Sequence, residues 1–329
     1  MSTRHTYLDT VGGIMLIHMM FVVHAARITN ICPSAVEYLM ALLTCFLPWF
    51  YFKSGMFYKG DGSLIGLFKK RARTLLLPFA VFSFIGWFFI YFLGSIFLGE
   101  SSISDLIADS FTTFLWEGAF NGNFALWFLL SLFLVTIAYR ILRMMKLKNS
   151  IVMILSFAGA FGIQLFDISL PTYVGNVCNG LFFYSLGVAL RQKQFNNYLF
   201  SICAVIMVIS AIFPSYLDYR ANEVVFGHKY YLLAELYCFA GIIVFNNIFY
   251  RYFPDTIPLL THVGRHSIKY YVVHYIFLIA LFRALTIIFH WSDPVVLFLV
   301  ITVSMCMLLY VSDIILSKKP FNALLGEYK

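Results

Sequence analysis

Seven ionisable side chains fall inside long apolar stretches of this sequence, where such groups are uncommon. By depth, at about 1.5 Å per helical residue, they are Lys53, His274 and Asp313 in the inner part, His18 near the middle, and His24, Glu235 and Arg283 toward the outer side. Within a membrane such groups are costly, so they face a partner or a water-filled cavity. Histidine can also take up or release a proton near neutral pH. The set predicts a polar path through a helix bundle.

Each of these residues also has a purely structural interpretation. His18 or His274 could hydrogen-bond a neighbouring helix, and Lys53 could extend its amine to the inner surface. Asp313 lies about one turn from an interface. Glu235 lies deeper in its apolar stretch, and a carboxylate there needs a partner, which Arg283 or His24 could supply.

The composition identifies the elements that must position these groups. The chain of 329 residues is 61% hydrophobic and only 12% charged, against about 25% charged in soluble domains. A helix needs about 20 mostly apolar residues to cross a bilayer. Suitable runs fall near 11–27, 35–58, 74–98, 125–140, 151–166, 173–190, 198–213, 230–249, 267–290 and 294–316. We therefore expect an all-α polytopic transmembrane bundle of about ten helices, forming a single domain over residues 1–329.

The basic residues predict the orientation of this bundle. With the N-terminus inside, the segments on the inner side hold eighteen of the 23 Lys and Arg residues, whereas the outer segments hold Arg27, Arg220 and Lys229. Short cytoplasmic loops carry this excess in membrane proteins. We expect both termini in the cytoplasm, and we interpret the net charge of +8 as orientation, not as nucleic-acid binding.

Two outer loops and the cysteines complete the survey. The longer loop, about 99–124, is acidic, and its second half is apolar enough to fold back into the membrane; the other spans 214–229. The six cysteines lie far apart without a CxxC pair, which indicates neither a zinc site nor a disulfide framework. The histidines are not spaced as a metal-ligand set, so we expect no metal.

Several segments together resemble the membrane acyltransferase-3 family. They are YLDTVGGIMLIHMMFVVH (7–24), LPWFYFKSGMFYK (47–59), FKKRARTLLLPF (68–79), ALWFLLSLF (125–133), LFFYSLGVALR (181–191) and VGRHSIKYYVVH (263–274). Each string alone is weakly specific, but their order and spacing cover nearly the whole chain. The resemblance implies an integral membrane enzyme, in the inner membrane of a bacterium, that transfers acyl groups from coenzyme A to sugars of surface glycans.

The first segment departs from the family pattern. Family members usually carry Arg or Lys three residues after the aspartate and eleven before the histidine, where this chain has Gly12 and Gly13. His24 is also one residue further from Asp9 than expected. Either His24 is the family histidine in a shifted register, or the chain is a divergent branch. Lys53 of the next helix could replace the missing cation, and an inactive relative is a further alternative.

The resemblance also suggests roles for particular residues. A base must remove the hydroxyl proton; we expect His24 in this role, with Glu235 orienting its ring and His18 as a further catalytic candidate. Acetyl-CoA is the expected donor, and its expected contacts are Lys53, Lys69, Lys70, Arg71, Arg73 and His274. The positive-inside rule by itself also explains the basic cluster. For the acceptor, Asn121, Asn123 and Trp127 are the expected contacts and oxyanion donors.

Two other functions fit the same features. A glycan-precursor transporter or flippase would use ten helices and an internal polar path, although we find no repeat between the halves of the chain. A structural scaffold would explain neither the two histidines of the first helix nor Glu235. The partners expected for an acyltransferase are a glycan or sugar acceptor and membrane lipids, with no nucleic acid.

Overall fold

The long apolar runs form helices because a helix pairs every backbone N–H and C=O within its own segment, as lipid requires. The computed structural model describes residues 6–31, 34–60, 62–99, 102–191, 196–212, 231–253 and 257–326, and the described residues contain helices but no β-strands. The expectation of an all-α polytopic bundle is confirmed. The loop 214–229 lies outside the described residues.

Each of the ten expected runs corresponds to a helix. Eight of the described helices are long and apolar enough to cross a membrane: Thr6–Thr29, Tyr38–Met56, Leu64–Phe97, Phe124–Met144, Thr172–Leu190, Tyr231–Tyr252, Ser267–Ile288 and Pro294–Leu316. Two shorter apolar helices, Asn149–Leu165 and Asn197–Ser210, match the remaining runs. The cytoplasmic position of the two termini stays a prediction.

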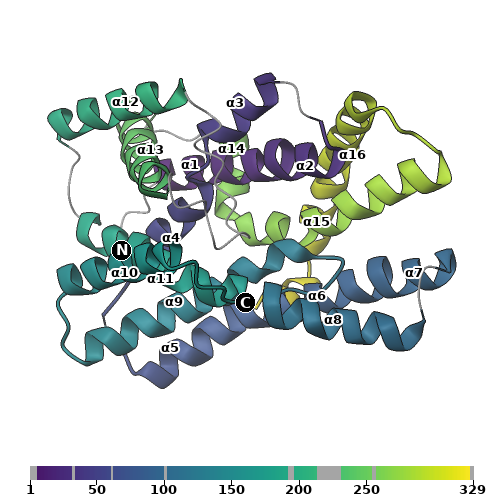
Figure 1. Ribbon diagram of the computed structural model, residues 1–329, viewed down its shortest axis with the longest axis horizontal. Helices are drawn as coiled ribbons and strands as arrows, with labels where there is room; N and C mark the ends of the chain where they lie inside the picture. Colours follow the sequence, from purple (N-terminus) through teal and green to yellow (C-terminus); the bar gives the residue numbers. More distant parts are fainter. Residues whose placement is uncertain are drawn as a thin grey trace.

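Figure 1 labels the helices in chain order. They are α1 (Thr6–Ile17), α2 (Ala25–Thr29), α3 (Ser34–Leu42), α4 (Phe46–Met56), α5 (Leu64–Arg71), α6 (Leu77–Ile85), α7 (Leu93–Leu98), α8 (Ile103–Glu117), α9 (Trp127–Met144), α10 (Asn149–Leu165), α11 (Thr172–Leu190), α12 (Asn197–Ala211), α13 (Tyr231–Tyr252), α14 (Pro258–Arg265), α15 (Ser267–Arg283) and α16 (Pro294–Leu316). Short π-helical segments, among them His18–His24, join some of these into longer helices, so α1 and α2 form one continuous span.

The first span occupies the centre of the bundle. Figure 1 shows α1 and α2 between α13 and α16, with α14 alongside, while α5, α8 and α9 form the opposite side. Contacts join α1 to α14, α13, α4 and α15. Most of the first span is buried inside the protein, whereas most of α16 is not. Most side chains on α1 and α2 therefore face other helices.

We expected a basic loop followed by a span over 74–98, whereas the structure has one helix over Leu64–Phe97. Its 34 residues extend about 50 Å at 1.5 Å per residue, beyond a hydrocarbon core of about 30 Å. The N-terminal part of this long helix is α5, and its last turn consists of Lys69, Lys70 and Arg71. The expected basic loop is thus a helical extension, which Ser63 caps through a 3.0 Å bond from the N–H of Gly66.

The acidic loop 99–124 also contains structure that we did not expect. Residues Ile103–Glu117 form α8, and a turn over 118–123 leads to α9. The turn packs within the bundle: Asn121 and Asn123 are buried, and the side chain of Asn123 donates to the carbonyl of Val272 in α15 at 3.0 Å. The apolar second half of this loop therefore enters the bundle.

Glycine brings α1 and α14 together backbone to backbone. A Cβ at Gly264 would lie 1.7 Å from the carbonyl oxygen of Asp9, and one at Gly13 would lie 2.0 Å from that of Leu260. Small residues permit such close packing between membrane helices. The hydroxyls of Thr10 and Thr261 also hydrogen-bond across this interface at 2.8 Å. Neither glycine can be enlarged unless the two helices separate.

We predict that Gly264→Ala destabilises the protein by about 1–3 kcal/mol, the usual cost of overpacking a close contact. Gly162→Ala in α10 is the matched control, because a Cβ there meets nothing within 4 Å. The measurement is the unfolding midpoint of the purified protein in detergent. Equal midpoints for the two variants would contradict the close α1–α14 contact.

Candidate functional site

Two histidines from distant parts of the chain form a direct pair inside the bundle. The Nδ1 atom of His24 lies 2.9 Å from the Nε2 atom of His274, and the two ring planes differ by only 10°. His24 ends the π-helical segment of the first span, and His274 lies within α15. Our expectation that His274 lies deeper toward the inner side than His24 was wrong, because the helices bring both rings to one level.

A carbonyl group fixes which nitrogen of each ring carries the proton. The Nδ1 atom of His274 lies 2.7 Å from the carbonyl oxygen of Tyr271, and a carbonyl can only accept a hydrogen bond. In the neutral pair, His274 therefore donates through Nδ1 and accepts through Nε2, so Nδ1 of His24 is the donor between the rings. The Nε2 atom of His24 keeps its lone pair and has no hydrogen-bond partner among the described residues.

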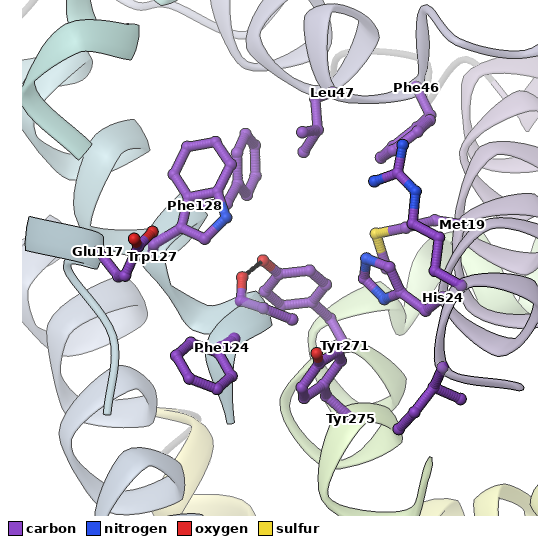
Figure 2. Close-up of a pocket in the computed structure, with 13 residues that line it drawn as sticks. Met19, His24, Phe46, Leu47, Glu117, Phe124, Trp127, Phe128, Tyr271 and Tyr275 are labelled. Carbon is purple, nitrogen blue, oxygen red and sulfur yellow. Dashed lines mark hydrogen bonds between the residues drawn. The ribbon is translucent and has the colours of Figure 1, made fainter. Parts of the chain in front are cut away.

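His24 faces a cavity of about 440 Å³, a volume typical of small-molecule sites. Its lining residues are Met19, His24, Arg27, Ile28, Phe46, Leu47, Glu117, Phe124, Ala125, Trp127, Phe128, Tyr271 and Tyr275. Figure 2 shows His24 on one wall, with Glu117 and Trp127 on the opposite wall and Tyr271 between them. A base with a free lone pair therefore faces an aromatic cavity that contains both a cation and a carboxylate.

A second cavity of about 370 Å³ adjoins the first. Met19, Leu47, Phe128 and Tyr271 line both cavities, so these four side chains form a shared wall. The ionic groups that line the second cavity are Lys53 and Arg71. Along the first span it is lined by Leu16 and Met19, whereas the first cavity reaches Arg27 and Ile28. The two cavities thus lie at different depths of the bundle.

The shared wall is held by a side chain that is itself anchored. The hydroxyl of Tyr271 donates to the carbonyl oxygen of Ala125, in the 3₁₀ turn Phe124–Leu126 that precedes α9, as the dashed line in Figure 2 marks. Tyr271 also accepts, through its own carbonyl, the Nδ1–H of His274. One residue of α15 therefore connects the histidine pair to the boundary between the cavities.

An ion-pair cluster occupies the place of the missing family cation. Nζ of Lys53 lies 3.5 Å from Oδ1 of Asp9, and Nε of Arg265 lies 3.7 Å from Oδ2. A Cβ at Gly12 would lie only 3.0 Å from Nζ of Lys53. The lysine of α4 thus puts its charge beside the position where the family pattern has a basic side chain on the first helix.

The π-helical segment His18–His24 bears on the other departure from the pattern. An i→i+5 turn holds one more residue than an α turn, which offsets the extra residue between Asp9 and His24. The ring of His24 consequently points toward α15 and not to a neighbouring face of the helix. Such segments are often found at functional sites.

Other expected catalytic residues lie away from the cavity. His18 is buried and donates through Nε2 to the carbonyl oxygen of Met40 at 3.3 Å. Glu235 is 3% exposed and has Asn179 and Tyr231 as its polar neighbours. The partner of the His24 ring is His274 and not Glu235. Arg283 donates to the carbonyl oxygen of Ile90 at 2.9 Å.

The expected donor and acceptor contacts divide in the same way. Lys53 and Arg71 line the second cavity, whereas Lys69, Lys70 and Arg73 are exposed and His274 lines neither cavity. Trp127 lines the first cavity. Asn121 and Asn123 are engaged elsewhere, because Asn121 donates to Asp109 at 2.7 Å and Asn123 donates to Val272.

Sequence reasoning missed four polar residues of the first cavity, namely Arg27, Glu117, Tyr271 and Tyr275. In the sequence, Arg27 is only one of the few outer cations, and Glu117 is only one of the acidic residues within 99–124. A usable signal was the pairing of Glu117 with Gly118, since a glycine after a helical run marks a helix end. For the two tyrosines the only signal was their position, because Tyr271 lies in the segment 263–274 and Tyr275 follows it directly.

Comparison with known proteins gives one match. A family model described as an acyltransferase domain, that of the acyltransferase-3 family, matches residues 7–315. No curated protein and no solved structure gives a significant match.

We predict that ¹⁵N NMR of the histidine-labelled protein in lipid finds His24 and His274 protonated at Nδ1 and His18 protonated at Nε2. The carbonyl partners of His274 and His18 dictate this pattern, and removal of each ring in turn assigns the signals. His18 is the internal control because it requires the opposite tautomer. A proton on Nε2 of neutral His24 would contradict the arrangement.

Proposed function

The chain belongs to the acyltransferase-3 family, and from this premise we propose that it transfers an acetyl group from acetyl-CoA to a sugar hydroxyl of a cell-surface glycan or its precursor. Family membership makes the chain an acyltransferase. The acetyl donor and the glycan acceptor are our proposal. The same membership argues against the alternative of a transporter or flippase.

One observation supports this proposal above the others. The free Nε2 of His24 faces a cavity that shares four lining residues with a second, cationic cavity. Transfer between two substrates needs a base and two binding spaces that meet at one point. The adjoining cavities supply the spaces, and the histidine pair supplies a base in a defined tautomer.

In the proposed reaction, Nε2 of His24 takes the proton of the acceptor hydroxyl as the oxygen attacks the thioester carbonyl carbon. The new C–O bond forms, the carbonyl π electrons move to oxygen, and they return as the C–S bond breaks. The thiolate then receives the proton from His24. General-base catalysis of this kind contributes about 10²–10⁴-fold. His274 acts as a positioning residue, because it holds the Nδ1–H of His24.

We assign the donor to the second cavity on charge and shape. Coenzyme A carries several phosphates, which arginine and lysine bind through charge-assisted hydrogen bonds. Lys53 and Arg71 are the cations of this cavity, and leucines and phenylalanines provide apolar surface for the pantetheine arm. The exposed Lys69, Lys70 and Arg73 would contact the nucleotide end outside it. His274 lies beside the base His24 and does not line the cavity that we assign to the donor.

The acceptor then occupies the first cavity. Trp127 lines this cavity on the wall opposite His24, so we expect its indole N–H to donate to the bound sugar and not to the oxyanion of the thioester. With the N-terminus inside, the second cavity faces the cytoplasm, where coenzyme A is made, and the first lies toward the outer side. We propose the inner membrane of a bacterium as its location.

We predict that His24→Ala lowers acetyl transfer by about 10²–10⁴-fold, the contribution of a general base. The measurement is release of coenzyme A from radiolabelled acetyl-CoA by purified protein in lipid, with candidate sugars added. The control is His290→Ala, at an exposed position that lines neither cavity. Equal activity of His24→Ala and the native protein would exclude His24 as the base.

We predict that Arg71→Gln raises the KM for acetyl-CoA about tenfold or more, because a hydrogen bond to a charged group contributes about 1.5–3 kcal/mol. The same variant should leave the KM for S-acetylpantetheine unchanged, since that donor has no phosphate. Lys148→Gln, an exposed change, controls for lost surface charge. Equal effects on both donors would place Arg71 outside the phosphate site.

A further inference from the structure

The wall opposite His24 presents a carboxylate that the proposed chemistry does not use. Glu117 is the last residue of α8, and the helix ends at Gly118, which has a φ of +68°. The turn is packed tightly, because a Cβ at Gly118 would lie 2.4 Å from the ring of Tyr173. The backbone of Glu117 is therefore fixed where α8 meets α11, and its side chain lines the first cavity.

One oxygen of this carboxylate is anchored and the other is not. The hydroxyl of Thr172, at the start of α11, donates to Oε2 of Glu117 at 3.0 Å. The Oε1 atom has no hydrogen-bond partner among the described residues. An ionised carboxylate oxygen accepts about two hydrogen bonds. Thr172 orients the group, and Oε1 is left to accept from a molecule in the cavity.

The distribution of charge indicates what that molecule is. The ionic residues of the second cavity are both cations, which suits an anionic ligand. The first cavity contains one cation, Arg27, and it has Glu117 on the wall with Trp127, opposite His24 (Figure 2). A carboxylate there repels an anion and favours hydroxyl donors, and the rings of Phe124, Trp127 and Tyr275 offer apolar surface to C–H groups.

We propose that Glu117 determines acceptor specificity by accepting hydrogen bonds at Oε1 from two neighbouring hydroxyls of an uncharged pyranose. The sugar then spans the cavity, with a further hydroxyl directed to Nε2 of His24. This inference rests on the proposed acyl transfer, and it specifies the acceptor as a neutral sugar with adjacent free hydroxyls. Sugars with a carboxylate at the Glu117 wall are excluded by repulsion.

The test uses methyl glucoside, methyl galactoside and methyl mannoside as probes, with methyl glucuronide as the charged counterpart. Coenzyme A release from acetyl-CoA is measured for the native protein, Glu117→Gln and Asp105→Asn, each reconstituted in lipid. Asp105→Asn is the matched control, because it removes a carboxylate from an exposed position on α8 itself. Release without any sugar measures the donor side and the base.

We expect at least one neutral glycoside to increase release by the native protein, and Glu117→Gln to raise the KM for that glycoside about tenfold or more. Sugar-independent release by Asp105→Asn should equal that of the native protein, and the preference for the neutral sugar over the glucuronide should fall only in Glu117→Gln. An unchanged KM in Glu117→Gln, or a native preference for the glucuronide, would overturn the proposal.

A binding measurement keeps this inference separate from the acyl transfer itself. Saturation-transfer NMR reports contact between each methyl glycoside and the protein without acetyl-CoA. If the native protein released no coenzyme A but bound a neutral glycoside through Glu117, the proposal of acyl transfer would be overturned, whereas the proposal of a sugar site would stand. If Glu117→Gln bound the glycosides as well as the native protein does, the proposal of a sugar site at Glu117 would be overturned, whatever acyl-transfer activity is measured.

Discussion

Lipid offers no hydrogen-bond partner, and this constraint governs where the polar groups of the bundle lie. A polar side chain buried at membrane depth needs a partner on its own helix or on another helix, or it faces a cavity. The His24–His274 bond, the Lys53–Asp9 pair and the Thr10–Thr261 bond all cross between helices that are distant in sequence. The same requirement explains why the first span, which carries Asp9, His18 and His24, lies at the centre.

The close α1–α14 contact links the ionic and the catalytic parts of the site. Gly13 and Gly264 let the two backbones meet, which brings Arg265 to Asp9 and starts α15 at a fixed position beside the first span. Seven residues further along α15, His274 meets His24. The carbonyl of Tyr271 then sets the tautomers of both rings, so helix packing decides which nitrogen is basic.

The two cavities divide the charges of the site according to ligand. Cations line the space that we assign to the phosphate-bearing donor, whereas a cation and a carboxylate line the space that we assign to the acceptor. The wall between them consists of Met19, Leu47, Phe128 and Tyr271, and three of these side chains are apolar. A reaction at this boundary would be shielded from water, which strengthens the interactions of the few polar groups present.

The sequence by itself determined the elements and the kind of chemistry. Continuous apolar runs predict membrane helices because only helices pair their own backbone in lipid, and every expected run is a helix. The order of the motifs identified the family. The rarity of histidine within apolar runs drew attention to His18, His24 and His274, and the resemblance favoured His24 among them. The sequence could not establish that Lys53 lies beside Gly12, because residue spacing along one helix does not determine which residues of the next helix it contacts.

Only the tertiary structure decided which of these residues act together. Depth counting placed His274 below His24 because it assumed straight, upright α-helices, whereas a π-helical segment and the packing of α15 bring the rings level. Glu235, equally prominent in the sequence, lies beside Asn179 and Tyr231, and Glu117 faces the cavity because Gly118 ends α8 there. Which residues meet across helices depends on how the helices cross and on the rotation of each helix about its axis. Distant segments determine this geometry together, so no local sequence pattern encodes it.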